Sequence, residues 1–160
     1  MVVVLRAPLR SRDDDVDHAA AVAHALRRGL VGVGGRLPEP PADLDDAVAQ
    51  VARRHGDRTA ARLGRFAAFD RGAFAWTRDV AGELWLGRVT GSWRFDPSAD
   101  AATFDLQHVR ECLWLDDPVP WPEVPAAVHA TFERGGRNLQ RVHDLGAEAG
   151  SQLLWERYGR

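Results

Sequence analysis

The stretch DRGAFAWTRDVAGELWLGRVTGSWRF, residues 70–95, has the strongest β-strand signal in the chain. Aromatic and β-branched residues, which favour strands, lie on both sides of a short loop that contains a glycine. We expect a hairpin whose loop is the four residues Asp79 to Gly82. That register pairs three sets of residues across the strands: Arg78 with Glu83, Trp76 with Trp85, and Phe74 with Gly87.

In this register the two paired tryptophans share one face of the hairpin, which allows two interpretations. Aromatic pairs contribute a few tenths to about 1 kcal/mol to a sheet, so the hairpin can simply be the centre of a β core. Alternatively, the tryptophans line a pocket for a flat ligand.

The composition is that of an ordinary globular chain. Its 160 residues are 45% hydrophobic and 28% charged, and we expect a single domain over residues 1–160. No apolar run approaches the roughly 20 residues of a membrane span, and the N-terminus lacks the features of a signal peptide. A single cysteine, Cys112, leaves no internal disulfide. These features predict a cytoplasmic protein.

All 21 basic residues are arginines. Without lysine there is no phosphate-loop lysine, no Schiff-base lysine and no lysine-dependent nuclease site. No nucleophile motif or metal-binding histidine spacing occurs; His18 and His24 are expected at the surface. The sequence therefore predicts a noncatalytic protein without metal or cofactor. Its formal net charge of −2 argues against tight nonspecific binding to nucleic acid.

Hydrophobic periodicity and end signals predict the remaining elements. Strands are expected at residues 2–5, 30–35 and 105–115, and a loop at residues 96–100. Helices are expected at residues 16–28, 43–54, 59–69 and 123–132, with a short one after Asn138 and a last one within residues 145–160. The predicted class is α+β: a mostly antiparallel, barrel-like sheet of five or six strands with flanking helices.

Two strands carry features that suit a ligand. Gly32, Gly34 and Gly35 leave one face of their strand without side chains, which either permits close packing on a helix or makes the strand end a pocket floor. In the strand at 105–115, His108 and Trp114 alternate onto a mixed polar and apolar face. Cys112 on the same face is expected to be a small buried hydrophobe.

Arginines gather in two places. Arg58, Arg62 and Arg65 follow one face of the helix at 59–69. Arg134, Arg137 and Arg141 cluster after the helix at 123–132. Each cluster is either a solvated surface or a contact line for phosphates.

The order of the motifs GLVGVGG (29–35), RGAFAWTRD (71–79), LWLGRVTGSWRFD (84–96), VRECLWL (109–115) and GGRNLQRVHD (135–144) resembles the PUA-like superfamily. This group contains the EVE, YTH and ASCH domains. The similarity is greatest to uncharacterised members found beside bacterial restriction and defence proteins. The resemblance implies a pseudo-barrel with a cleft for a flipped, modified nucleobase. This chain has Gly35 where relatives often have an aromatic residue.

Transferred to matching positions, the resemblance implies that the base pocket contains Val33, Gly34, Trp76, Thr77, Arg78 and Trp93. The strand pattern adds His108 and Trp114. We therefore expect a noncatalytic reader of modified bases, in DNA rather than RNA, that works with a nuclease or another defence protein; both arginine clusters would contact phosphates. The alternatives are a protein–protein interaction module and a small-molecule or nucleotide sensor.

Overall fold

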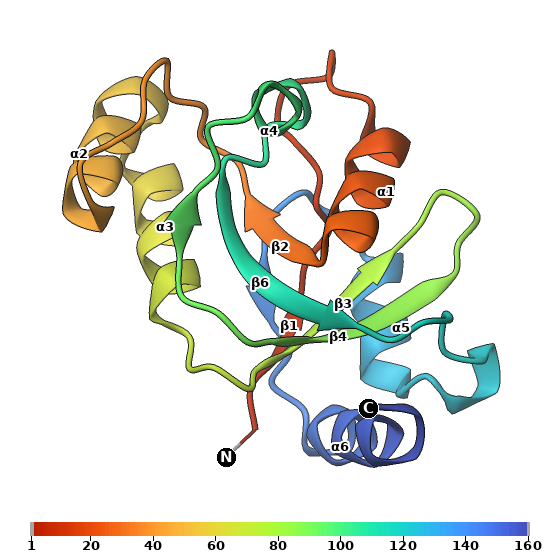
Figure 1. Ribbon diagram of the computed structural model, residues 1–160. Coiled ribbons are helices and arrows are strands. Elements are labelled where there is room, and N and C mark those ends of the chain that lie inside the picture. The colour runs from red at the N-terminus through yellow and green to blue at the C-terminus, as the bar shows by residue number, and fades with distance from the viewer. Residues whose placement is uncertain (1, 160) are drawn as a thin grey trace.

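The computed structural model describes residues 2–159, in which helices surround a strongly curled sheet (Figure 1). The strands are β1 (Val4–Arg6), β2 (Leu30–Val33), β3 (Phe74–Arg78), β4 (Leu84–Val89), β5 (Arg94–Phe95), β6 (His108–Trp114) and β7 (Gln140–Arg141). The helices are α1 (His18–Arg28), α2 (Leu44–His55), α3 (Asp57–Ala68), α4 (Ala99–Phe104), the 3₁₀ turn η1 (Trp121–Glu123), α5 (Ala126–Glu133) and α6 (Leu145–Tyr158).

The sheet runs in the order β2-β6-β4-β3-β1-β7, with β5 paired to β6. Only the β1–β3 pair is parallel among these strands. The predicted α+β class with a mostly antiparallel, barrel-like sheet is therefore confirmed, and the sheet has seven strands rather than five or six. Among residues 2–159, no helix has the length and apolar character needed to cross a membrane.

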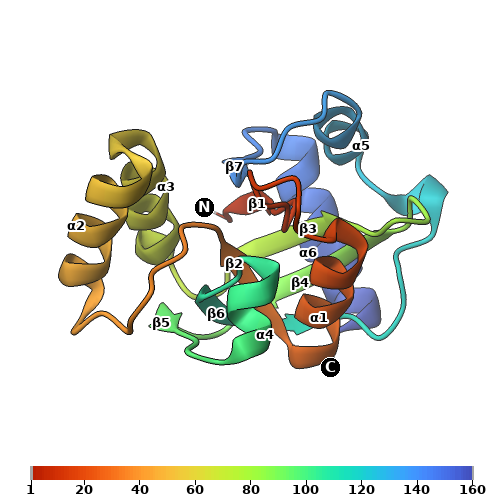
Figure 2. The same ribbon diagram turned by 90° about the horizontal axis from the view of Figure 1, so that it is seen from above.

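Helices flank the sheet on both sides (Figure 2), and a core of buried side chains lies against each face of the sheet. One contains buried side chains of α1, α2 and α3, such as Val22, Val51 and Phe66. The other contains buried side chains of α5 and α6, such as Phe132 and Trp155. Helices α1 and α2 begin within two residues of their predicted starts at residues 16 and 43, and Asp17 and Asp43 accept backbone N–H bonds at these ends.

The predicted register of the central hairpin is wrong by one residue. The loop contains three residues, Val80 to Gly82, because Asp79 pairs with Glu83 and Gly82 adopts a positive φ of 87°. The observed partners are Arg78 with Leu84, Thr77 with Trp85, Trp76 with Leu86, and Ala75 with Gly87. Because side chains alternate along a strand, this slip puts Trp76 and Trp85 on opposite faces.

Three local predictions are also corrected. The loop predicted at residues 96–100 ends at Ser98, where α4 begins, since the Ser98 side chain accepts a hydrogen bond from Ala101 N. The segment after Asn138 is the strand β7 because it pairs with the backbone of β1. His24 is buried, at 3% exposure, and packs against Phe104 instead of facing solvent. Cys112 is buried as predicted, and burial raises the pKa of its thiol.

Candidate functional site

A cavity of about 380 Å³ opens where β2 ends. Four further segments line it: the loop after β1, the end of α2 with one side of α3, the segment between α4 and β6, and the segment before β7. The lining residues are Pro8, Leu9, Arg10, Arg12, Asp13, Gly32, Val33, Gly34, Gly35, Arg36, His55, Thr59, Arg62, Asp105, Leu106, Arg137, Asn138 and Leu139.

The glycines of β2 and the residues after it form the floor of the cavity, and two of them have no room for a side chain. A Cβ on Gly32 would stand 2.8 Å from the carbonyl oxygen of His108. A Cβ on Gly34 would stand 2.8 Å from Oδ2 of Asp105. The bare backbone at these positions therefore lets the floor and the buried carboxylate lie in contact.

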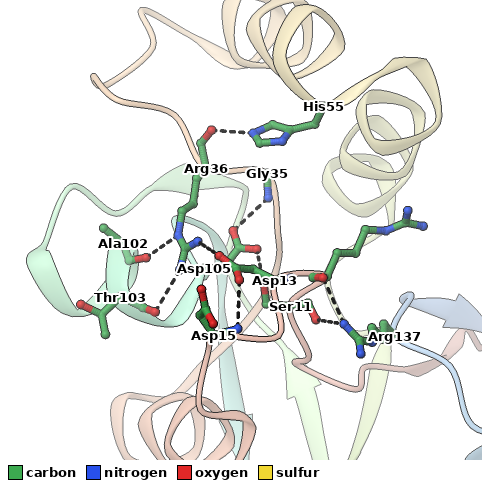
Figure 3. Close-up of polar contacts among 11 residues, drawn as sticks. Ser11, Asp13, Asp15, Gly35, Arg36, His55, Ala102, Thr103, Asp105 and Arg137 are labelled. Atoms are coloured by element: carbon green, nitrogen blue, oxygen red, sulfur yellow. Dashed lines mark hydrogen bonds and ion pairs between the residues drawn. The ribbon is translucent and has the colours of Figure 1, made fainter.

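Asp105 places a carboxylate in the cavity wall and is only 9% exposed. The residue ends α4 in the left-handed conformation, at φ 54°, which aspartate tolerates better than most residues. Its Oδ1 accepts a hydrogen bond from Gly35 N at 3.1 Å, and its Oδ2 accepts one from Ser11 Oγ at 2.6 Å (Figure 3). Both donors are neutral, so the carboxylate is held by hydrogen bonds without an ion pair to any of residues 2–159.

Two arginines hold the loops around the cavity together. Arg36 donates to the carbonyl oxygens of Ala102 and Thr103 and forms a 2.8 Å ion pair with Asp13 (Figure 3). Arg137 donates to two backbone carbonyls of the loop after β1, those of residues 11 and 12, and pairs with Asp14 at 2.6 Å. These guanidinium groups shape the entrance of the cavity, and the donors of Arg137 are directed at the protein itself.

A second, more open hollow of about 560 Å³ adjoins the cavity, and we call it the arginine groove. Three of the predicted phosphate contacts, Arg62, Arg65 and Arg141, meet here, although they come from different arginine clusters in the sequence. Arg62 lines both hollows. The groove is lined by Arg6, Arg62, Arg65, Phe69, Asn138, Leu139, Gln140, Arg141 and His143. Arg58 and Arg134 line neither hollow.

Arg62 is the arginine that lines both hollows, and it forms no ion pair with any of residues 2–159. Its Nη1 atom is buried and has no hydrogen-bond partner. Burial, followed by the positive charges of Arg12, Arg65 and Arg58, lowers the pKa of Arg62. A buried donor without a partner costs roughly 1–3 kcal/mol, which an anionic ligand at this point would offset.

Arg6 belongs to the groove and was not anticipated. It is 5% exposed and donates to the carbonyl oxygens of Thr131, Gly135 and Asn138, which fixes the segment between α5 and β7. Burial, followed by the charge of Arg134, lowers its pKa. The only sequence signal was an arginine at the end of a buried apolar strand.

Four of the predicted pocket residues lie away from the cavity. Trp76 is fully buried in the core under α6, where its Nε1 donates to Ser151 Oγ at 3.0 Å. Thr77 is also fully buried, and Trp114 donates to the carbonyl oxygen of Leu30. Arg78 lies over the Phe132 ring. Their burial or their contacts on another face keep all four from lining the cavity.

The other four predicted residues lie at or directly behind the floor. Val33 and Gly34 line the cavity. His108 is fully buried: its Nε2 lies 2.8 Å from the Gly35 carbonyl oxygen, and Trp93 Nε1 lies 3.4 Å from its Nδ1. Since a carbonyl only accepts, we assign the proton to Nε2, and Nδ1 accepts from the indole. Burial lowers the pKa of His108, which keeps this supporting ring neutral.

Comparison with known proteins finds a solved structure with a similar fold. Among solved structures, the YTH domain of the Zygosaccharomyces rouxii MRB1 protein in complex with N6-methyladenosine RNA aligns with a TM-score of 0.50, over 99% of this chain and 85% of that chain, at 9% sequence identity. The fold resembles that of a YTH domain. No protein-family model and no curated protein sequence matches the chain.

Proposed function

We propose that this protein binds nucleic acid without catalysis, with one base in the cavity and the adjoining phosphates in the arginine groove. The observation that carries the proposal is Arg62, an unpaired guanidinium that lines both hollows. When a base enters the cavity, the phosphates attached to its sugar lie just outside, at the boundary between the two hollows where Arg62 lies. Such a phosphate would supply the acceptor that Nη1 lacks.

The size and lining of the cavity suit a flipped base. Its volume of about 380 Å³ falls within the roughly 300–1,000 Å³ of small-molecule sites. Leu9, Val33, Leu106 and Leu139 provide apolar surface, and Asp105 provides a polar group that orients a ligand. Aliphatic side chains thus take the place of the aromatic walls that the sequence led us to expect.

The distribution of charge fits local rather than general binding. The chain has a net charge of −2, so its attraction to nucleic acid is concentrated where arginines meet in the groove. The motif resemblance favours a modified base in DNA and a role beside a restriction or other defence enzyme. The YTH domain of similar fold was solved with methylated RNA, so DNA and RNA belong in the same test.

Fluorescence anisotropy with labelled single-stranded DNA and RNA, each with and without one modified base, tests the proposal. We expect binding that weakens with salt, and Arg62→Gln should weaken it about tenfold and lower the salt dependence by about one counterion. Arg53→Gln, at an exposed position of α2 outside both hollows, is the matched control. Equal affinity of the two variants, or no binding by the wild-type protein, contradicts the proposal; binding of free nucleosides alone favours a small-molecule sensor.

A further inference from the structure

Asp105 has unused hydrogen-bonding capacity that faces the cavity. An ionised carboxylate offers about four acceptor positions, and Gly35 N and Ser11 Oγ occupy two of them. Buried charges are ordinarily paired or fully hydrogen-bonded, because leaving water costs several kcal/mol. Asp105 is 9% exposed and has no ion pair within residues 2–159, so a ligand in the cavity is the natural source of its remaining donors.

The second carboxylate of the lining does not compete for this role. Asp13 is exposed and forms its ion pair with Arg36 at 2.8 Å. It also accepts a hydrogen bond from Asp15 N. Asp105 is therefore the acceptor deep in the wall, and Asp13 belongs to the entrance.

Resting on the function proposed above, we infer that Asp105 selects a base that carries an exocyclic amino group. Adenine, cytosine and guanine each present such N–H donors, and aspartate accepts from amino groups of this kind at base edges. Thymine and uracil present carbonyl oxygens instead, and a carbonyl oxygen beside the Asp105 carboxylate is repelled. A single methyl group on the amino nitrogen leaves one N–H, whereas two methyl groups leave none.

The conservative variant Asp105→Asn replaces one hydrogen-bond acceptor of the side chain by a donor and is designed to preserve the fold. Its amide oxygen still accepts from Gly35 N, and its amide nitrogen donates to the Ser11 hydroxyl. Asparagine also tolerates the left-handed backbone at φ 54°. The variant therefore offers the cavity an N–H donor in place of a second carboxylate oxygen, which favours a base carbonyl.

The test is an anisotropy series with single-stranded oligonucleotides that differ at one central base: adenine, monomethylamino-adenine, dimethylamino-adenine, cytosine or thymine. For the wild-type protein we expect thymine and dimethylamino-adenine to bind about tenfold more weakly than the others. Asp105→Asn should abolish or reverse that preference, whereas Asp100→Asn, at an exposed position of α4 outside the cavity, should preserve it.

The outcomes separate this inference from the function on which it rests. Binding that is equal for all five bases overturns the role of Asp105 and leaves nucleic-acid binding standing. The same holds if Asp105→Asn binds with wild-type selectivity. If no oligonucleotide binds the wild-type protein, both ideas fall. The wild-type series needs no substitution, so it decides the matter even if the variant does not fold.

Discussion

Gly34 and Asp105 lie so close that a Cβ atom on the glycine would stand 2.8 Å from Oδ2 of the carboxylate. We expect Gly34→Ala to displace the carboxylate from Ser11 and to lower the free energy of unfolding by about 1–2 kcal/mol. It should also weaken binding of a base in the cavity. Urea unfolding and oligonucleotide titration measure the two effects.

A second glycine provides the control for this substitution. Gly64 lies within α3, and a Cβ there would meet no atom within 4 Å. Gly64→Ala should stabilise the protein by about 0.5–1 kcal/mol because alanine restricts the unfolded chain. If both substitutions have the same effect, the contact between Gly34 and Asp105 does not constrain the cavity.

His24 makes stability depend on pH. The ring is 3% exposed and neither nitrogen has a hydrogen-bond partner; burial, followed by the charge of Arg27, lowers its pKa below the ordinary 6.5. As the pH is lowered through about 6.5, the unfolded chain takes up a proton more readily than the folded protein, so stability decreases as the pH decreases, by at most about 1.4 kcal/mol per pH unit for this group.

Replacing this ring tests its contribution. His24→Leu should reduce the loss of stability between neutral pH and pH 5, as measured by urea unfolding at a series of pH values. Burial also lowers the pKa of His108, so the stability of the variant should still depend partly on pH. His143→Leu, which removes a histidine side chain at an exposed position, is the matched control. A His24→Leu profile identical to that of the wild-type protein would refute the assignment.

Asp79 holds the turn of the central hairpin. Its Oδ1 accepts from Ala81 N and Glu83 N, and its Oδ2 accepts from Trp85 Nε1 at 2.9 Å. Asp79→Ala should lower the free energy of unfolding by about 1–2 kcal/mol. Val80→Ala, at a position of the same loop that is 82% exposed, should change it by less than about 0.5 kcal/mol. If Asp79→Ala leaves the free energy of unfolding unchanged, the strands alone set the register of the hairpin.

Cys112 should report unfolding by its reactivity. The thiol is 3% exposed, and burial raises its pKa, so little thiolate is available in the folded protein. Labelling with a thiol reagent near pH 8 should be slow without denaturant and complete in urea. An exposed cysteine introduced by Ser92→Cys should label at once under both conditions. Rapid labelling of native Cys112 would show that β6 opens readily.

Local patterns in the sequence were sufficient to predict most elements of the fold. The helices predicted at residues 16–28, 43–54 and 59–69 are observed as α1, α2 and α3 with ends shifted by at most two residues. The helix α4 was missed because it has only six residues, too few for a clear period. Asn138 suggested a helix, but pairing with β1 made β7, since a neighbouring strand edge outweighs a weak local preference.

The sequence by itself determined the class of the fold, the aromatic strands and the two groups of arginines, because propensity and periodicity act within a few neighbouring residues. The tertiary structure alone decided which tryptophan faces which core, because one residue in a turn reverses every side chain of a strand. It alone brought Arg62 beside Arg141, and Asp105 beside Ser11 and Gly35. Such contacts join segments far apart in the chain, and only the packing of the sheet and helices specifies them.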